Sequence, residues 1–240
     1  MSFLVSTMLD LTCRAGTGTT AESVKHCILT LRRLLYPNYA VIPIEEHTLL
    51  KEPWAPGCAL FVIPGGADLG YCRVLNGAGN RLISRYVRNG GRYLGLCAGG
   101  YYGTNRCEFE VGDQALEVIG ARELAFFPGT CRGAAFKGFR YASEIGARAA
   151  KLSLNLDALP GSENLTPSVC CYYNGGGVFV DAEGMAGAEV EVLASYEDDV
   201  ALGADSGKAG VVYCKAGNGA AILTGPHPEY VAPHTSARSD

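Results

Sequence analysis

Several features that would assign this 240-residue sequence to a particular class of protein are missing. No stretch approaches the ~20 consecutive apolar residues that a membrane-spanning helix needs, so we expect no association with a membrane. Lysines and arginines form no block, and the densest stretch, Lys25 to Arg33, is typical of the solvated face of a helix. With a net charge of −4, the chain is not expected to bind nucleic acid. The apolar start from Met1 to Cys13 has no basic segment and is interrupted by Asp10, which argues against a signal peptide.

The ten cysteines lack the spacing of a metal site or a disulfide framework. No two of them form a Cys-x-x-Cys pair, the unit from which zinc ribbons are built. Cys58 and Cys214 adjoin apolar runs, as buried and reduced thiols do. Because reduced thiols are typical of a reducing compartment, we expect a cytoplasmic protein. The stretch from Gly203 to Lys208 does not have the spacing of a phosphate loop, so we interpret it as a surface turn. From this and from the cysteine spacing, we expect neither a metal nor another cofactor.

Apolar residues and glycine, in contrast, are abundant. The hydrophobic share of 48% is enough for a substantial core, and the length suits a single domain, which we expect over residues 1–231. The polar residues 232–240 are expected to form a frayed tail. The 32 glycines follow no repeat, so we interpret them as required by individual turns and close backbone approaches.

The first half of the sequence alternates between strands and helices. Thr20 is a good N-cap, the apolar residues from Val24 to Leu35 recur at helical spacing, and Pro37 ends that helix. A second, amphipathic helix is predicted over Arg73 to Asn89. Strands are predicted at residues 3–13, 39–44, 58–63 and 92–96. This alternation predicts an α/β fold with a mostly parallel central sheet and helices on both of its faces.

The second half is rich in predicted strands and poor in helices. Apolar or alternating runs predict strands at residues 116–119, 124–127, 150–154, 169–173, 178–181, 190–196, 209–214 and 220–224. We expect these strands, in mixed or antiparallel order, to extend the central sheet.

Cys97 lies at the centre of a Gly-x-Cys-x-Gly pattern, between a predicted strand and a predicted helix. In a nucleophile elbow of this form, a sharp turn holds the central residue in strained backbone geometry and needs small residues two positions away on either side. Gly95 and Gly99 meet that need. The positive end of the following helix would also favour the thiolate form of Cys97. The alternative interpretation is a buried cysteine on a glycine-rich turn.

His227 is the histidine best positioned to act as a base for this nucleophile. The other three histidines are predicted in the first helix, in a loop and in the tail: His26, His47 and His234. His227 follows the strand 220–224, and the carboxyl ends of parallel strands share one rim, so it can meet Cys97. Glu229, two residues further on, can orient the imidazole ring and stabilise its charged form. Taken alone, this segment could equally be a capped loop.

Backbone N–H groups for an oxyanion hole are available on two neighbouring turns. A glycine pair follows the predicted strand 58–63, and a second turn follows the nucleophile. Amides at such positions can face the oxygen that becomes negative during attack on a carbonyl. The candidates for binding the oxyanion or the substrate are Gly65, Gly66, Ala98, Gly99 and Tyr101. The glycine pair could also be a plain turn, and Tyr101 could belong to the core, as could Tyr71 and Tyr102.

Taken together, these segments resemble a known family. Ile63-Pro64-Gly65-Gly66, the elbow around Cys97, and His227-Pro228-Glu229 are similar in kind and order to the oxyanion strand, nucleophile elbow and His-x-Glu of class I glutamine amidotransferase domains. More narrowly, three longer segments resemble the amidotransferase-like N-terminal domain of fungal biotin–protein ligases: residues 61–69, 94–103 and 224–230. The resemblance covers nearly the whole chain and implies a flavodoxin-like sandwich with a Cys97–His227–Glu229 triad.

The sequence departs from this pattern in two respects. Glutamine-hydrolysing members carry a glutamine shortly after the elbow, where this chain has Ala98-Gly99-Gly100-Tyr101-Tyr102. The sequence also lacks the glycine- and arginine-rich adenylate loop of the biotin-ligase catalytic domain, so we do not expect this chain itself to attach biotin.

Two functions are consistent with these observations. The first is a cysteine hydrolase or amidase that acts on a carbon–nitrogen bond of a small amide or acid. The second is a catalytically silent module that binds such a molecule and regulates a biotin–protein ligase catalytic domain. A purely structural domain is the least favoured, since strained elbows are costly to maintain.

Overall fold

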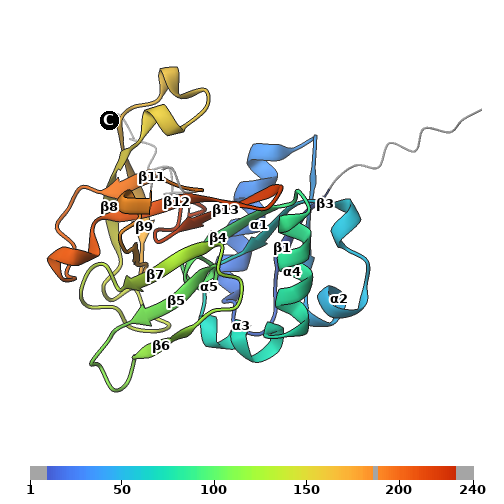
Figure 1. Cartoon of the computed structure of the whole chain (residues 1–240), viewed down its shortest axis with the longest axis horizontal. Coiled ribbons are helices and arrows are strands. Elements are labelled where there is room, and N and C mark those ends of the chain that lie inside the picture. Colours follow the sequence, from blue (N-terminus) through green and yellow to red (C-terminus); the bar gives the residue numbers. More distant parts are fainter. Residues whose placement is uncertain (1–9, 186–188, 231–240) are drawn as a thin grey trace, which may run out of the picture.

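A nine-stranded sheet forms the framework of the molecule (Figure 1). The computed structural model describes residues 10–185 and 189–230. The strand order is β2-β1-β3-β4-β13-β12-β11-β8-β9, with parallel pairs as far as β13 and antiparallel pairs beyond it. The parallel strands are β1 (Asp10–Arg14), β2 (Ala40–Ile44), β3 (Cys58–Ile63), β4 (Arg92–Leu96) and β13 (Gly219–Thr224). The antiparallel strands are β8 (Arg148–Leu154), β9 (Ser168–Tyr173), β11 (Val190–Tyr196) and β12 (Ala209–Ala216).

This mixed sheet confirms the predicted α/β class and the mostly parallel first half. Strands β3, β4 and β11 have the predicted bounds, and the other strands of this sheet differ from prediction by a few residues at their ends. Residues 3–9 of the predicted first strand and the predicted tail 232–240 lie outside the described residues.

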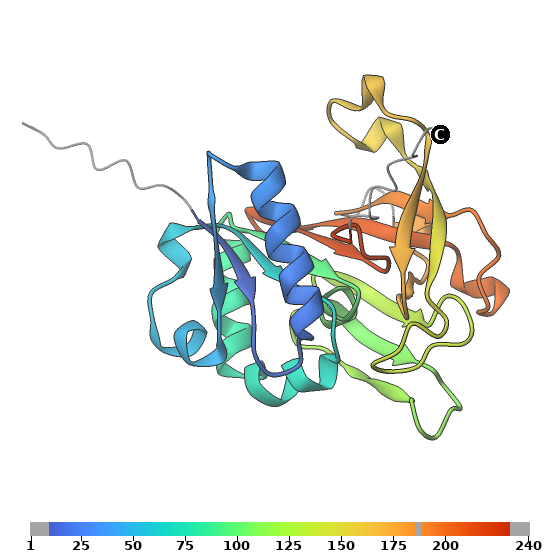
Figure 2. The ribbon, with the colours of Figure 1, turned by 180° about the vertical axis from the view of Figure 1, so that it is seen from behind.

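Helices cover both faces of the parallel half (Figures 1 and 2). One face carries α1 (Ala21–Leu35), and the other carries α3 (Asp68–Leu75), α4 (Ala78–Arg88) and α5 (Ala98–Tyr102). Side chains alternate along β3, so Val62 belongs to the apolar cluster beneath α1, whereas Phe61 and Ile63 belong to the cluster on the opposite face. Helix α1 begins at its predicted N-cap, because the Thr20 hydroxyl oxygen accepts the N–H of Ser23 at 3.2 Å.

Some strands of the second half form a separate sheet, so the expectation that all of them extend the central sheet is wrong. The smaller sheet has the order β10-β7-β5-β6. Its members are β5 (Thr104–Phe109), β6 (Val118–Ala121), β7 (Phe127–Gly133) and β10 (Val178–Phe179). Strand β5 was not predicted, and β7 overlaps a predicted strand only at Phe127. The predicted strand 124–127 is also wrong, because Ala125 has a φ of 45° that interrupts extended backbone. Leu124 and Phe126 are apolar because they are buried in the core.

The predicted helix over Arg73 to Asn89 is in fact two helices. Helix α3 begins before the predicted start and ends at Leu75, and α4 follows after a short break. Gly77, within this break, has a φ of 78°, which glycine adopts at little cost and which interrupts a helix. His47, expected in a loop, lies in the short helix α2 (Glu46–Lys51).

Close backbone packing fixes the turn from β4 into α5. A Cβ atom added to Gly95 would lie closer than 3.0 Å to the carbonyl oxygen of Gly99. A Cβ atom on Gly99 would clash in the same way with the carbonyl of Ile63 in β3, and one on Gly100 with the carbonyl of Thr224 in β13. The partners are backbone atoms, which cannot rotate away. The glycines therefore let α5 lie directly against three strand ends.

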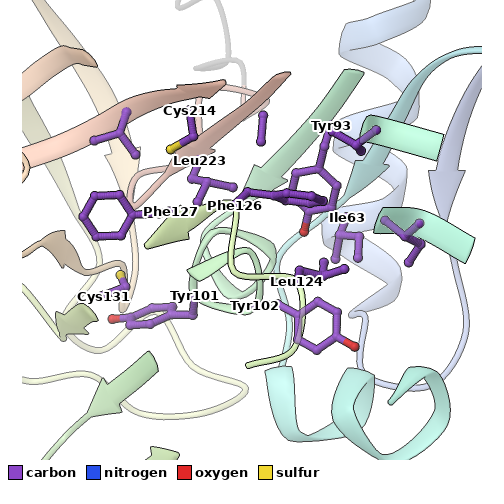
Figure 3. Close-up of a cluster of buried hydrophobic side chains, with 14 of the residues drawn as sticks. Ile63, Tyr93, Tyr101, Tyr102, Leu124, Phe126, Phe127, Cys131, Cys214 and Leu223 are labelled. Carbon is purple, nitrogen blue, oxygen red and sulfur yellow. The ribbon is translucent and has the colours of Figure 1, made fainter. Parts of the chain in front are cut away.

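Aromatic side chains fill the core beneath this turn (Figure 3). Tyr101 and Tyr102 of α5 and Tyr93 of β4 are buried there, and each hydroxyl finds a partner. The Tyr102 hydroxyl donates to Asn80 Oδ1 at 2.7 Å, and the Tyr93 hydroxyl donates to the carbonyl of Gly99 at 2.9 Å. Because these buried hydroxyls are satisfied, the aromatic rings can pack without an unpaired polar group and hold α5 in place.

Gly99→Ala is predicted to lower the free energy of unfolding by about 2 kcal/mol or more, because the new methyl group meets fixed backbone. Gly57→Ala is the matched control, since a Cβ atom at Gly57 meets nothing within 4 Å. Urea denaturation of both variants measures the difference. A Gly99→Ala midpoint no lower than that of Gly57→Ala would contradict this description of the turn.

Candidate active site

Adjacent strand ends bring the candidate catalytic residues to one rim of the sheet. In the parallel register Thr224, the last residue of β13, pairs with Leu96, the last residue of β4. Cys97 follows Leu96 directly, and His227 is the third residue after Thr224. Strand β3, the other neighbour of β4, runs in the same direction and delivers the glycine pair to the same rim.

Cys97 occupies the turn in a strained conformation. Its φ and ψ are 49° and −104°, a region that residues other than glycine rarely adopt. Backbone bonds hold this geometry, because the N–H of Cys97 donates to the carbonyl of Thr224 at 2.9 Å and its carbonyl accepts the N–H of Tyr101 at 3.0 Å. The thiol is mostly buried and donates to the carbonyl oxygen of Asn174 at 3.7 Å.

His227 and Glu229 form a buried pair beside this thiol. The His227 Nδ1 lies 2.8 Å from Glu229 Oε1, and the two side chains are only 6% and 4% exposed. Their backbone is anchored from two sides. The N–H of His227 donates to the carbonyl of Tyr172 at 2.8 Å, and the hydroxyl of Thr30 in α1 donates to the carbonyl of Glu229 at 2.7 Å. The carboxylate can therefore orient the imidazole ring so that Nε2 is free for another partner.

The electrostatic surroundings favour a protonated imidazole. Burial alone lowers the pKa of His227, but the negative charges of Cys97 and Glu229, and their hydrogen bonds to the ring, outweigh burial and raise the pKa to about 10. An imidazolium next to a cysteine sulfur is the partner that stabilises a thiolate. The three residues thus form one coupled charge system.

The coupled residues open onto a cavity of about 540 Å³ that Cys97, Ala98, Gly66 and His227 help to line. Ala98 is the first residue of α5, so its N–H has no acceptor one turn earlier in the helix. Gly66 pairs with Thr19 in an isolated antiparallel bridge. The N–H groups of Ala67 and Thr20 donate the hydrogen bonds of this bridge, and the N–H of Gly66 takes no part in them. Both N–H groups predicted for an oxyanion hole therefore belong to residues at the cavity wall.

The remaining three predicted site residues have different positions. Gly65 supports the site from behind, since a Cβ atom there would lie 2.6 Å from Cε1 of His227. Gly99 packs under the turn and does not line the cavity. Tyr101 lines the cavity with its ring, while its hydroxyl donates to the carbonyl of Gly175 at 3.1 Å. Tyr71, by contrast, is fully buried and donates to the carbonyl of Pro64 at 2.9 Å.

The residues that form the rest of the cavity wall were not predicted from the sequence. This wall includes Asp68 at the start of α3, Tyr172 and Asn174 at the end of β9, residues 139–144 and Tyr230. The Tyr230 ring stacks on Tyr172 at 4.6 Å between centroids. Asp68 and Tyr230 lie within the segments that resemble the family, so the resemblance could have identified these two residues as candidates. Nothing in the sequence relates residues 139–144 to a nucleophile more than forty positions earlier.

The described part of the chain offers no metal centre. Across residues 10–185 and 189–230, no three His, Cys, Asp or Glu side chains are grouped so that they could hold a metal ion. All ten cysteines are free thiols. Over the same residues, no helix is both long and apolar enough to span a membrane.

Comparison with known proteins identifies the family. Residues 9–240 match the family described as "Biotin-protein ligase, N terminal". This chain belongs to that family. It is 40% identical over 218 residues to a biotin–protein ligase of Schizosaccharomyces pombe, which covers 90% of this chain and only 33% of the ligase. It is also 34% identical over 226 residues to an uncharacterized protein of Chlamydia muridarum, covering 93% of this chain and 81% of that protein. The chain therefore spans about a third of the fungal ligase and most of the bacterial relative.

Solved structures share the fold of this chain at low sequence identity. A ThuA-like protein from Bacteroides uniformis aligns with a TM-score of 0.57 and 12% identity, over 93% of this chain and 84% of that protein. A β-galactosidase from Bacillus circulans aligns with a TM-score of 0.51 and 12% identity, over 92% of this chain and 29% of the enzyme. At such identities the likeness extends to the mixed α/β fold alone.

Cys97→Ala is predicted to lower the pKa of His227 from about 10, because burial is then opposed by Glu229 alone. Nitrogen chemical shifts of the imidazole, followed by NMR across a pH series, measure this change. Cys170→Ala, which alters an exposed cysteine, is the control and is expected to leave the titration unchanged. A His227 that titrates identically in wild type and Cys97→Ala would contradict the coupling.

The raised pKa of His227 also predicts how the free energy of unfolding depends on pH. Since the folded pKa of His227 lies above its ordinary value of 6.5, the stabilisation from its charged form is complete below about pH 6.5 and is lost as the pH rises through about 10. This loss in unfolding free energy is expected to be smaller in Cys97→Ala than in wild type.

Proposed function

We propose that this ligase N-terminal domain is a cysteine hydrolase that cleaves the carbon–nitrogen bond of a small amide, with an active site of class I glutamine amidotransferase type. One observation carries the proposal: a cysteine on a positive-φ turn faces the same cavity as a buried His–Glu pair 2.8 Å apart. That combination supplies a nucleophile, a proton carrier and an orienting carboxylate in one place. A purely structural turn would need neither the buried charges nor the cavity.

The proposed reaction begins with the Cys97 thiolate attacking the amide carbon to form a tetrahedral adduct. The negative oxygen of the adduct is stabilised by the N–H groups of Gly66 and Ala98. The His227 imidazolium then gives its proton to the leaving nitrogen, and the carbon–nitrogen bond breaks to release an amine or ammonia. Neutral His227 next takes a proton from water, which attacks the thioester and releases the acid. Glu229 stabilises the imidazolium throughout.

The size and the lining of the cavity indicate which kind of substrate it would accept. Its volume of about 540 Å³ lies within the range of sites for small molecules. Tyr101 also lines it, within the segment after the elbow where glutamine-hydrolysing relatives carry a glutamine. The substrate is therefore proposed to be a small amide other than free glutamine.

Cys97 is predicted to react with iodoacetamide at neutral pH at least ~10-fold faster than the exposed Cys170, because only a thiolate is an efficient nucleophile. His227→Ala removes the stabilising cation and should slow the labelling of Cys97. His26→Ala is the matched control, because His26 stacks on Tyr230 at the same cavity without belonging to the proposed triad. Peptide mass spectrometry over time gives the rate at each cysteine. Equal rates at Cys97 and Cys170 would contradict the proposal.

A second candidate function is a regulatory one. In the S. pombe biotin–protein ligase, the matching region makes up a third of a longer protein, so a domain of this type occurs in the same chain as a ligase. The cavity could then bind a small amide or acid without turnover and transmit its occupancy to a neighbouring ligase catalytic domain.

Adding this chain to a separately prepared biotin-ligase catalytic domain is predicted, under the regulatory function, to change the rate or apparent affinity of biotin transfer. The measurement is transfer of labelled biotin to an acceptor protein, with and without the chain. The Cys97→Ser variant should act like wild type if regulation depends on binding alone, and should lose its effect if regulation depends on hydrolysis. No change in rate or affinity with either protein would count against the regulatory function.

A further inference from the structure

The cavity holds a charged group that the proposed chemistry does not use. Asp68 lies at the start of α3, follows the oxyanion turn by two residues and lines the cavity. Its side chain is only 9% exposed. The N-cap of this helix is Ala67, which has no side chain to cap it, and the Asp68 carboxylate accepts its hydrogen bond from Arg122 instead of from the helix. Local helix capping therefore does not account for this buried carboxylate.

Arg122 holds the Asp68 carboxylate in a buried ion pair. Both its Nε and its Nη2 lie 2.7 Å from the same oxygen, Oδ2. Arg122 does not line the cavity, and its Nη1 donates to the carbonyls of Gly120 and Ala121 at 3.1 and 2.9 Å. The guanidinium is thus fixed by three bonded groups outside the cavity wall, whereas Asp68 itself lines the cavity.

Stability alone is a weak reason to retain such a pair. Removing two charges from water costs free energy that their mutual attraction does not reliably repay, so well-packed apolar residues often serve a core equally well. A buried carboxylate at the wall of a cavity is, in contrast, well suited to bind a hydrogen-bond donor or a positive charge.

Aromatic rings surround the same end of the cavity. Phe109, Phe139 and Tyr141 all line it and meet edge to face or tilted, with centroids 5.2 Å apart for Phe109 and Phe139 and 4.9 Å for Phe139 and Tyr141. Burial raises the pKa of Tyr141 to about 12, and Asp68 adds to the shift, so this ring lies within electrostatic reach of the carboxylate. Aromatic faces carry negative potential and attract cations, which the carboxylate would reinforce.

This end is distinct from the triad. His227 is hydrogen-bonded to Glu229, whereas the Asp68 carboxylate is held by Arg122. The other charged side chains at the cavity wall are Glu22, Arg140 and Glu144. Arg140 is directed to the carboxylate of Asp113 at 3.8 Å, so the lining as a whole is acidic.

We propose that Asp68, with the rings of Phe139 and Tyr141, forms a subsite for an ammonium group carried by the substrate amide. The subsite deepens the proposed function, on which it rests, by naming the substrate class: small amides with a primary amine on the part remote from the scissile bond. Asp68 acts there as a binding residue for specificity and takes no part in bond cleavage.

Two chloroacetamides of equal length test the subsite without requiring turnover: N-(3-aminopropyl)-2-chloroacetamide, which is cationic, and N-butyl-2-chloroacetamide, which is neutral. Both alkylate a thiolate with loss of chloride. In the wild-type chain the cationic reagent is expected to modify Cys97 about tenfold faster than the neutral one, relative to their rates with free cysteine. Mass spectrometry of the Cys97 peptide over time gives both rates.

Two variants isolate the subsite. Asp68→Asn combined with Arg122→Gln removes both charges of the pair, so no buried charge is left alone, and it should reduce the preference to about one. Tyr141→Leu changes a partly exposed ring and should reduce the preference even if the double variant does not fold. Glu163→Gln, at an exposed carboxylate that does not line the cavity, is the control and should keep the preference.

The outcomes separate the two proposals. Equal modification of Cys97 by both reagents in the wild type, or an undiminished preference in Tyr141→Leu and in the double variant where that folds, overturns the subsite alone. A Cys97 that reacts with neither reagent faster than Cys170 overturns the proposed hydrolase and the subsite with it.

Discussion

The site depends on one close backbone contact: α5 lies directly against the ends of β3, β4 and β13. Three glycines permit it, because any side chain at Gly95, Gly99 or Gly100 would meet a carbonyl of the turn itself or of a neighbouring strand. The contact forces Cys97 into a positive φ and turns its thiol toward the cavity. The same strand ends deliver His227, so the geometry of the nucleophile and the position of its partner have a common origin in the parallel register.

Burial strengthens the electrostatic interactions among the side chains of this site. His227 and Glu229 are removed from water, where an isolated charge would be unfavourable. The pKa of His227 is nevertheless raised, because its ring faces Glu229 and the Cys97 sulfur. The Asp68–Arg122 pair follows the same rule at the other end of the cavity. The His227–Glu229 pair and the Asp68–Arg122 pair therefore adjoin one cavity of small-molecule size, with aromatic rings near Asp68. Membership of the biotin–protein ligase N-terminal family does not assign a substrate to this cavity.

The sequence predicted the parts of the fold that local patterns determine. The apolar run 58–63 and the N-cap Thr20 were sufficient because their signals lie within a few residues. The division into two sheets was not predictable in this way, because strand pairing depends on partners far along the chain. The triad candidates were found because glycine spacing and parallel topology constrain them locally. The buried ion pair of Asp68 was not predicted, because its partner Arg122 is 54 positions away and only the folded chain brings the two together.

The most direct test of the account is a crystal structure of the chain after reaction with iodoacetamide. The account predicts an acetamide group bonded to the Cys97 sulfur, with its carbonyl oxygen at about 2.7–3.1 Å from the N–H groups of Gly66 and Ala98. The His227 ring should lie beside the sulfur and remain bonded to Glu229. An unmodified Cys97, or an adduct whose oxygen points away from both N–H groups, would contradict the claim that this turn, this histidine and these amides form one active site.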